Sequence, residues 1–63
     1  MNNTNGAALL ARVKAGDLVT VRTPSGSLLT GRYRENTLGL PLAIAPGGRF
    51  QFVTAGNIIR VQP

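Results

Sequence analysis

The sequence predicts a mainly β protein, a small five-stranded barrel preceded by one short N-terminal helix. Three observations indicate this class. Alternating segments rich in β-branched residues recur at close spacing, turn residues rich in Gly and Pro separate them, and a single stretch has helical character. Five short strands in an open sheet would expose unpaired edges, so we expect the sheet to close or nearly close into a barrel.

A hairpin within residues 17–35 is the segment against which the others are placed. Residues 18–23 and 28–35 alternate, and Pro24-Ser25-Gly26-Ser27 between them has turn composition. Successive side chains of a strand point to opposite faces of the sheet. The positions expected on the apolar, core-facing side are Val19, Val21, Thr23, Leu29, Gly31 and Tyr33. The positions expected on the outer side are Leu18, Thr20, Arg22, Leu28, Thr30, Arg32 and Arg34.

The helical stretch is residues 7–14, which are good helix formers. Thr4 or Asn5 can cap its start, and Gly16 stands where a left-handed residue is expected after its end. A helix this short is marginal alone in water, so its apolar side chains must pack against the sheet or a neighbouring subunit.

Three further strands are expected at residues 40–45, 49–54 and 57–62, with a turn at 46–48. Phe50 and Phe52 share one face and are expected in the core, because the chain has two Phe, one Tyr and no Trp. In the last strand Ile59 and Val61 share a face, opposite Ile58 and Arg60. The apolar residues then left outside, which could form a subunit contact, are Leu18, Leu28, Val53 and Ile58.

Length and composition limit the function classes. We expect a disordered tail at residues 1–6 and a single domain at 7–63, whose thin core makes homo-oligomerisation attractive. There is no Cys and no His, so a thiolate metal site and the commonest general base are excluded. Asp17 is expected to cap a turn and Glu35 to neutralise a neighbouring Arg. We therefore expect no enzyme, cofactor, metal or small-molecule substrate, and a cytoplasmic protein without a membrane segment.

The charge favours a polyanionic partner. Seven Lys and Arg against two acids give a formal net charge of +5, and six of the seven cations are Arg, which suits bidentate phosphate contacts. If the last strand pairs beside the first, outer-face arginines gather into one cationic stripe. We expect this face to bind RNA or DNA through Arg22, Arg32, Arg34, Arg49 and Arg60, with Asn36 and Gln51 as candidate readers of base edges.

The order of elements resembles that of the Sm-like proteins. VTVRTPSGSLLTGRYRE is similar to their first signature, with Gly26 and Gly31 in the places of its two glycines. FVTAGNIIRV is similar to the second, with Asn57-Ile58-Ile59 in the place of its asparagine and apolar pair. The resemblance covers residues 7–62 and implies a ring of subunits joined by their fourth and fifth strands, with RNA as ligand.

The chain departs from that family at its nucleotide pocket. Glu35-Asn36-Thr37-Leu38 has no clear counterpart of the Asp and Asn that follow the bent strand, and the Lys-His pair of the Hfq branch is replaced around Ala55-Gly56. GDLVTVRTPSG (residues 16–26), together with Gly31, also resembles KOW and other SH3-like barrels. Residues 49–61 are similar to the VQIY segment of type II dihydrofolate reductases, where Gln51 matches but Phe52 and Val53 do not. A structural or protein-interaction subunit is the alternative function.

Overall fold

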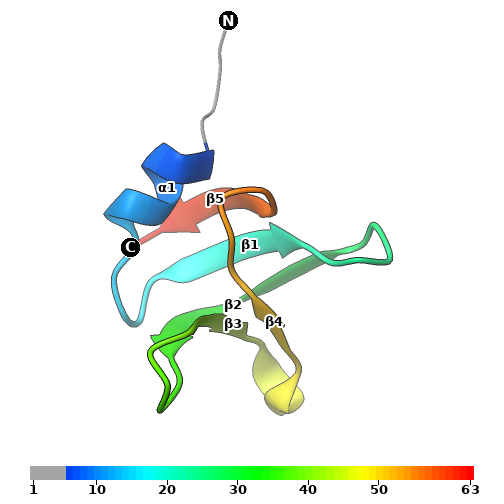
Figure 1. Cartoon of the computed structure of the whole chain (residues 1–63). Coiled ribbons are helices and arrows are strands. Elements are labelled where there is room, and N and C mark those ends of the chain that lie inside the picture. The colour runs from blue at the N-terminus through cyan, green and yellow to red at the C-terminus, as the bar shows by residue number, and fades with distance from the viewer. Residues whose placement is uncertain (1–5) are drawn as a thin grey trace, which may run out of the picture.

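A computed structural model describes residues 6–63, which form one helix and one sheet of five antiparallel strands (Figure 1). The elements are α1 (Gly6–Arg12), β1 (Leu18–Arg22), β2 (Leu28–Glu35), β3 (Pro41–Ile44), the 3₁₀ turn η1 (Pro46–Gly48), β4 (Phe50–Phe52) and β5 (Ile58–Gln62). The predicted mainly β class with one short N-terminal helix is confirmed. Among these residues no helix is long and apolar enough to cross a membrane.

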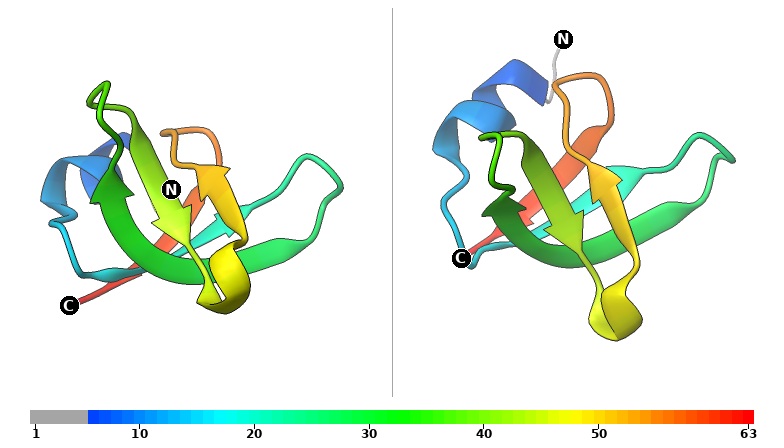
Figure 2. Two further views of the ribbon diagram at one scale, coloured as in Figure 1. Left: turned by 90° about the horizontal axis from the view of Figure 1, so that it is seen from below. Right: turned by 60° about the horizontal axis from the view of Figure 1, so that its bottom comes forward.

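The strand order β4-β3-β2-β1-β5 follows from a strong bend in β2, the longest strand. Its first half pairs with β1 and its second half with β3, and Figure 2 shows it curving between the two. Gly31 lies at the bend, where a Cβ would stand 2.6 Å from the Ile44 carbonyl oxygen and 2.7 Å from the Ala45 nitrogen. The absence of a side chain therefore lets β2 and β3 approach closely.

The two ends of the folded sheet, β4 and β5, do not pair with each other within residues 6–63. The predicted pairing of the last strand with the first is confirmed, because β5 pairs antiparallel with β1. The barrel is thus nearly closed, with a seam between β4 and β5. Helix α1 lies beside β5 (Figure 1), and a Cβ at Gly6 would collide with the Ala55 carbonyl oxygen.

The core is made of aliphatic side chains from β1, β2, β3 and β5 and from the loop after β4. Its buried residues are Val19, Val21, Leu29, Ala43, Val53 and Ile58. Partly buried Leu9, Leu10 and Val13 pack against this cluster, so the N-terminal segment covers the sheet as expected. Burial of each such side chain contributes about 1.5–3 kcal/mol, and no single one dominates.

The core differs from the sequence prediction on β4 and β5. Phe50 and Phe52 are 58% and 45% exposed, so their placement in the core was wrong, and Val53 is buried instead. The alternation predicted for β4 was right, but the face predicted to point inward points outward. The inner face of β4 lies beside fully buried Ala43, close to where β2 and β3 approach each other at Gly31, so little room is left there for a phenyl ring.

A β-bulge explains the second difference. Thr20 pairs with Arg60 but Val21 pairs with Ile58, so Ile59 is an extra residue in β5. The bulge shifts the alternation by one residue, which buries Ile58 and leaves Ile59 39% exposed. The prediction that Ile58 lies outside was therefore wrong.

The turns account for the remaining differences. Helix α1 ends at Arg12, and Asp17 caps the following turn as expected, because its carboxylate accepts from the Lys14 amide at 2.9 Å. Gly16 has the expected positive φ, +94°. The expected caps and most of the expected tail fall on residues 1–5, which lie outside the described residues, while Gly6 is already helical. Strand β2 has the predicted bounds and the other strands are one to three residues shorter.

Candidate nucleic-acid interface

The outer face of the sheet is built from cross-strand rows fixed by the register. One row joins Arg32 on β2 to Ile44 on β3 and Phe50 on β4, and the next joins Arg34 to Leu42 and Phe52. Since these positions differ by two residues along each strand, they share one face. Two arginines therefore stand ~6.7 Å apart along β2, each in line with an aliphatic residue and a phenylalanine.

Arg32 is positioned by a hydrogen bond, because its Nη1 donates to the Gly16 carbonyl oxygen at 2.9 Å. Gly16 lies in the turn before β1. Its amide donates to the Tyr33 carbonyl oxygen at 3.0 Å, so this turn is itself hydrogen-bonded to β2. The bond uses one of the five N–H donors of the guanidinium, so the remaining donors are free for an anion. Arg34 makes no such contact with the described chain and is exposed.

Arg22 and Arg60 occupy the same outer face but stand apart from this pair. Arg60 lies in one row with Thr20 and Thr30, whose hydroxyls are 2.8 Å apart, whereas Arg32 lies in the next row and two strands away from Arg60. Arg22 lies opposite Leu28, four residues along β2 from Arg32, or ~13 Å. The arginines thus form separate groups on the outer face rather than the single contiguous stripe expected.

Arg49 lies between η1 and β4, directly before Phe50, and is exposed. Its backbone carbonyl oxygen accepts a hydrogen bond from the Ala45 amide at 2.7 Å. Its guanidinium group makes no hydrogen bond or ion pair with the described residues. Within residues 6–63 none of the arginines forms an ion pair. The expected neutralisation of an Arg by Glu35 is therefore not found in this part of the chain.

The amide side chain of Asn36, one of the two candidate base readers, is used within the fold, as is that of Asn57. The Asn36 Oδ1 accepts from the Leu38 and Leu40 amides at 2.8 and 2.9 Å, which fixes the β2–β3 loop. The Asn57 Oδ1 accepts from the Thr54 amide at 2.8 Å, and its Nδ2 donates to the Phe52 carbonyl oxygen at 2.7 Å. Gln51 is half-buried opposite Ala43. The geometry therefore favours the arginines over these amides as contacts.

The aromatic side chains of β4 were missed as candidate site residues. Phe50 and Phe52 form an edge-to-face pair, with ring centroids 6.3 Å apart and planes at 86°. Beside their rows lies a hollow of about 370 Å³ on the same outer side, lined mainly by apolar groups of Leu18, Ile44 and Pro46 together with Arg32. The sequence did contain one indication. Leu42 and Ile44 alternate with the small Ala43, so either face of this segment could have been the inner one, and Phe50 and Phe52 on the next strand could equally have faced outward.

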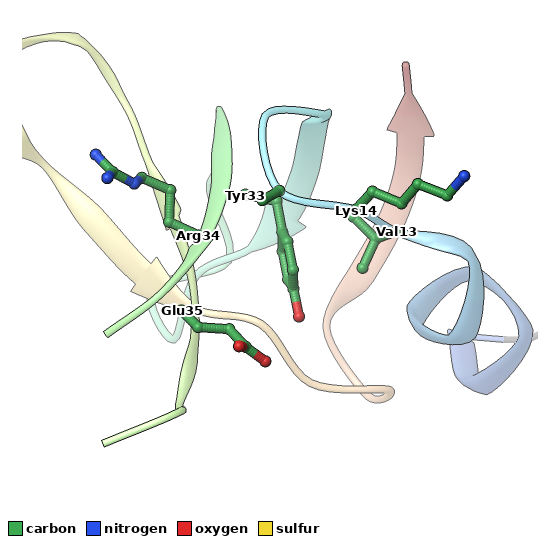
Figure 3. Close-up of a pocket in the computed structure, with 6 residues that line it drawn as sticks. Val13, Lys14, Tyr33, Arg34 and Glu35 are labelled. Atoms are coloured by element: carbon green, nitrogen blue, oxygen red, sulfur yellow. The ribbon is translucent and has the colours of Figure 1, made fainter. Parts of the chain in front are cut away.

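A second hollow, of about 460 Å³, lies between the segment after α1 and the end of β2. In Figure 3 the Tyr33 ring stands between Val13 and Glu35, while the Lys14 and Arg34 side chains project away from it. Burial, and secondarily the negative charge of Glu35, raises the pKa of Tyr33 above its usual value of 10.0. Tyr33 is thus a neutral, partly buried residue packed against the core, as its inward position predicted.

Comparison with known proteins adds no family. Neither a protein-family model, a curated protein nor a solved structure gives a significant match to this chain. The outer face of the sheet carries exposed guanidinium groups without ion pairs in the same rows as exposed phenyl rings, within the described residues. Such a surface can hold an anion that also presents flat apolar groups.

Proposed function

We propose that this protein binds nucleic acid through the arginine-bearing outer face of its sheet. The observation that carries the proposal is that Arg22, Arg32, Arg34, Arg49 and Arg60 are all exposed and, within the described residues, free of ion pairs. With two acids in the whole chain, the net charge of +5 is left for an external polyanion. The Sm-like order of elements makes RNA, rather than DNA, the first ligand to test.

The same fold favours assembly from several copies. Strands β4 and β5 are the two edges of the sheet, and the Sm-like resemblance implies pairing of these edges between neighbouring subunits. We propose a homo-oligomer that repeats the arginine groups around a common axis, which would raise affinity for a continuous strand. Light scattering measures its mass: a ring fits the Sm-like arrangement, a monomer fits a KOW-type module, and a tetramer would reopen the reductase resemblance.

Fluorescence anisotropy of a labelled oligonucleotide, titrated at several salt concentrations, tests binding. Each phosphate contact should contribute about 0.7–0.9 to the slope of log affinity against log salt. Arg34→Glu should weaken binding strongly and reduce that slope, because Arg34 lies on the proposed face and forms no hydrogen bond or ion pair with the described chain. Arg12→Glu makes the same charge change on α1 rather than on a strand of the proposed face, and it serves as the matched control.

The outcome decides against the proposal if wild-type protein does not bind at low salt, or if its affinity is insensitive to salt. Equal losses for Arg34→Glu and Arg12→Glu would also contradict it, because only net charge would then matter. Circular dichroism of each variant checks that the fold is retained.

A structural or protein-interaction subunit is the second candidate. It is favoured by the exposed apolar side chains Leu38, Phe50 and Phe52, which are 81%, 58% and 45% exposed. On this reading the positive charge aids solubility, no oligonucleotide binds, and the arginine variants leave the assembled mass unchanged. The anisotropy and light-scattering measurements together separate the two functions.

A further inference from the structure

The two outer-face rows of β2, β3 and β4 repeat the same chemical pattern. In each, an arginine is followed by an aliphatic residue and then a phenylalanine: Arg32, Ile44, Phe50 and Arg34, Leu42, Phe52. We call these two rows the platform. The arginine and the phenylalanine of one row are two strands apart, or ~9.6 Å, and the rows are ~6.7 Å apart.

Exposure of both phenylalanines is unusual for this chain. The sequence contains two Phe in 63 residues, and the core is filled by aliphatic side chains while both rings face outward. The apolar hollow of about 370 Å³ shares Arg32 and Ile44 with the row that ends at Phe50, and its other apolar lining comes from Leu18 and Pro46. Exposed apolar side chains beside a hollow and charged residues are typical of a binding face.

The charges on the platform decide between its possible occupants. A second copy laid face to face would bring its own unpaired Arg32 and Arg34, and its net charge of +5, against those of the first copy. A single-stranded nucleic acid instead supplies phosphates for the arginines and bases with flat faces for the rings. In a duplex those faces are stacked on one another, so they cannot reach the phenyl rings.

We propose that the platform binds unpaired bases of single-stranded nucleic acid, with Phe50 and Phe52 as stacking residues and Arg32 and Arg34 as phosphate contacts. This inference rests on the proposed nucleic-acid binding and names its substrate class. Because the two ring planes are 86° apart, one ring at a time presents its face to the outside. One base therefore stacks on a ring face while the neighbouring nucleotide lies against the edge of the other ring.

Anisotropy titrations of the full chain with a labelled single strand and with a blunt duplex of the same sequence test the inference. Wild-type protein should bind the single strand more tightly. Phe50→Ala and Phe52→Ala should each weaken single-strand binding about tenfold, with the salt slope unchanged because no phosphate contact is lost. Duplex affinity should stay the same. The matched control is Leu28→Ala, since Leu28 is 59% exposed on the outer face but lies outside the platform.

Phe50→Tyr and Phe52→Tyr keep an aromatic ring and should retain single-strand affinity, so they distinguish stacking from a general loss of packing on β4. Equal affinity for single strand and duplex, or losses in Phe50→Ala no larger than in Leu28→Ala, would overturn the inference while leaving nucleic-acid binding intact. A Phe→Ala change that lowers the oligomer mass with affinity unchanged would overturn it in favour of a subunit contact. Failure of wild-type protein to bind any oligonucleotide would overturn the proposed function itself.

Discussion

Gly31→Ala should be among the most damaging single substitutions in this fold. The new Cβ would stand 2.6 Å from the Ile44 oxygen and 2.7 Å from the Ala45 nitrogen, and both are backbone atoms of β3 or its end. The Ile44 carbonyl carbon would be closer still, so reaching ordinary contacts near 3.4 Å requires β2 and β3 to separate by ~1.0 Å, since no flexible side chain can yield. Overpacking of this kind costs about 1–3 kcal/mol, and weakening a ladder hydrogen bond adds about 1 kcal/mol.

The expected loss of about 2–4 kcal/mol is large for this chain. At about 0.05–0.15 kcal/mol per residue, a domain of this size has a total free energy of unfolding of roughly 3–9 kcal/mol. Thermal denaturation followed by circular dichroism should show a Tm lower by about 4–8 °C for each kcal/mol lost. Protein concentration must be held fixed, because assembly would make the Tm depend on concentration.

Gly26→Ala provides the matched control for this measurement. Gly26 has a φ of +88° but no atom within 4 Å of a Cβ, so its substitution adds backbone strain of about 1–2 kcal/mol without a clash. A Gly31→Ala protein with nearly wild-type stability, or one more stable than Gly26→Ala, would refute the reasoning from the close approach of β2 and β3.

Three further changes have defined outcomes. Leu29→Ala should lower the free energy of unfolding in urea by about 2–5 kcal/mol, whereas neighbouring Leu28→Ala should stay within about 0.5 kcal/mol, because Leu29 is buried and Leu28 is not. Asn57→Ala should cost about 1–3 kcal/mol in the same assay, since it removes the two side-chain hydrogen bonds that Asn57 makes across the β4–β5 loop. The raised pKa of Tyr33 favours its neutral form in the folded state, so its contribution to stability is present below pH ~10 and is lost as the pH rises through the folded-state pKa. Tyr33→Phe should remove this loss of stability at alkaline pH. Because Tyr33 is the one tyrosine in the chain, the absorbance of tyrosinate reports its titration directly, and a titration midpoint at the usual tyrosine pKa of 10.0 would contradict the raised pKa.

Local patterns were sufficient for the hairpin and for the order of the elements. The alternation of Val19 and Val21 with polar neighbours determined the buried face of β1, and Gly26 placed the turn. Such signals lie within a few residues of one another, so they can be read without knowing the rest of the fold.

The later strands depended on information that is not local. Alternation in β4 separated Phe50 and Phe52 from Gln51 and Val53, but the side that faces inward is decided by the narrow space near Gly31 and Ala43, far away in sequence. The bulge at Ile59 arises from pairing with β1, and β5 itself contains no Gly that would mark it.

For the candidate site, alternation correctly predicted exposed arginines on one face, but the register decides which of them are neighbours. Arg32 and Arg34 are close because they share a strand, whereas Arg60 is on β5, with β1 between it and β2. The association of Arg32 with Phe50 required the positions of three strands at once, so it could not be read from the sequence.

The shortness of β4 limits what its open edge can contribute to assembly. A neighbouring strand laid along three residues would gain about one or two backbone hydrogen bonds, because only alternate groups of an antiparallel strand point outward. So few backbone hydrogen bonds cannot by themselves hold two subunits together. The stability and the specificity of any interface along this edge must therefore come from the side chains around it.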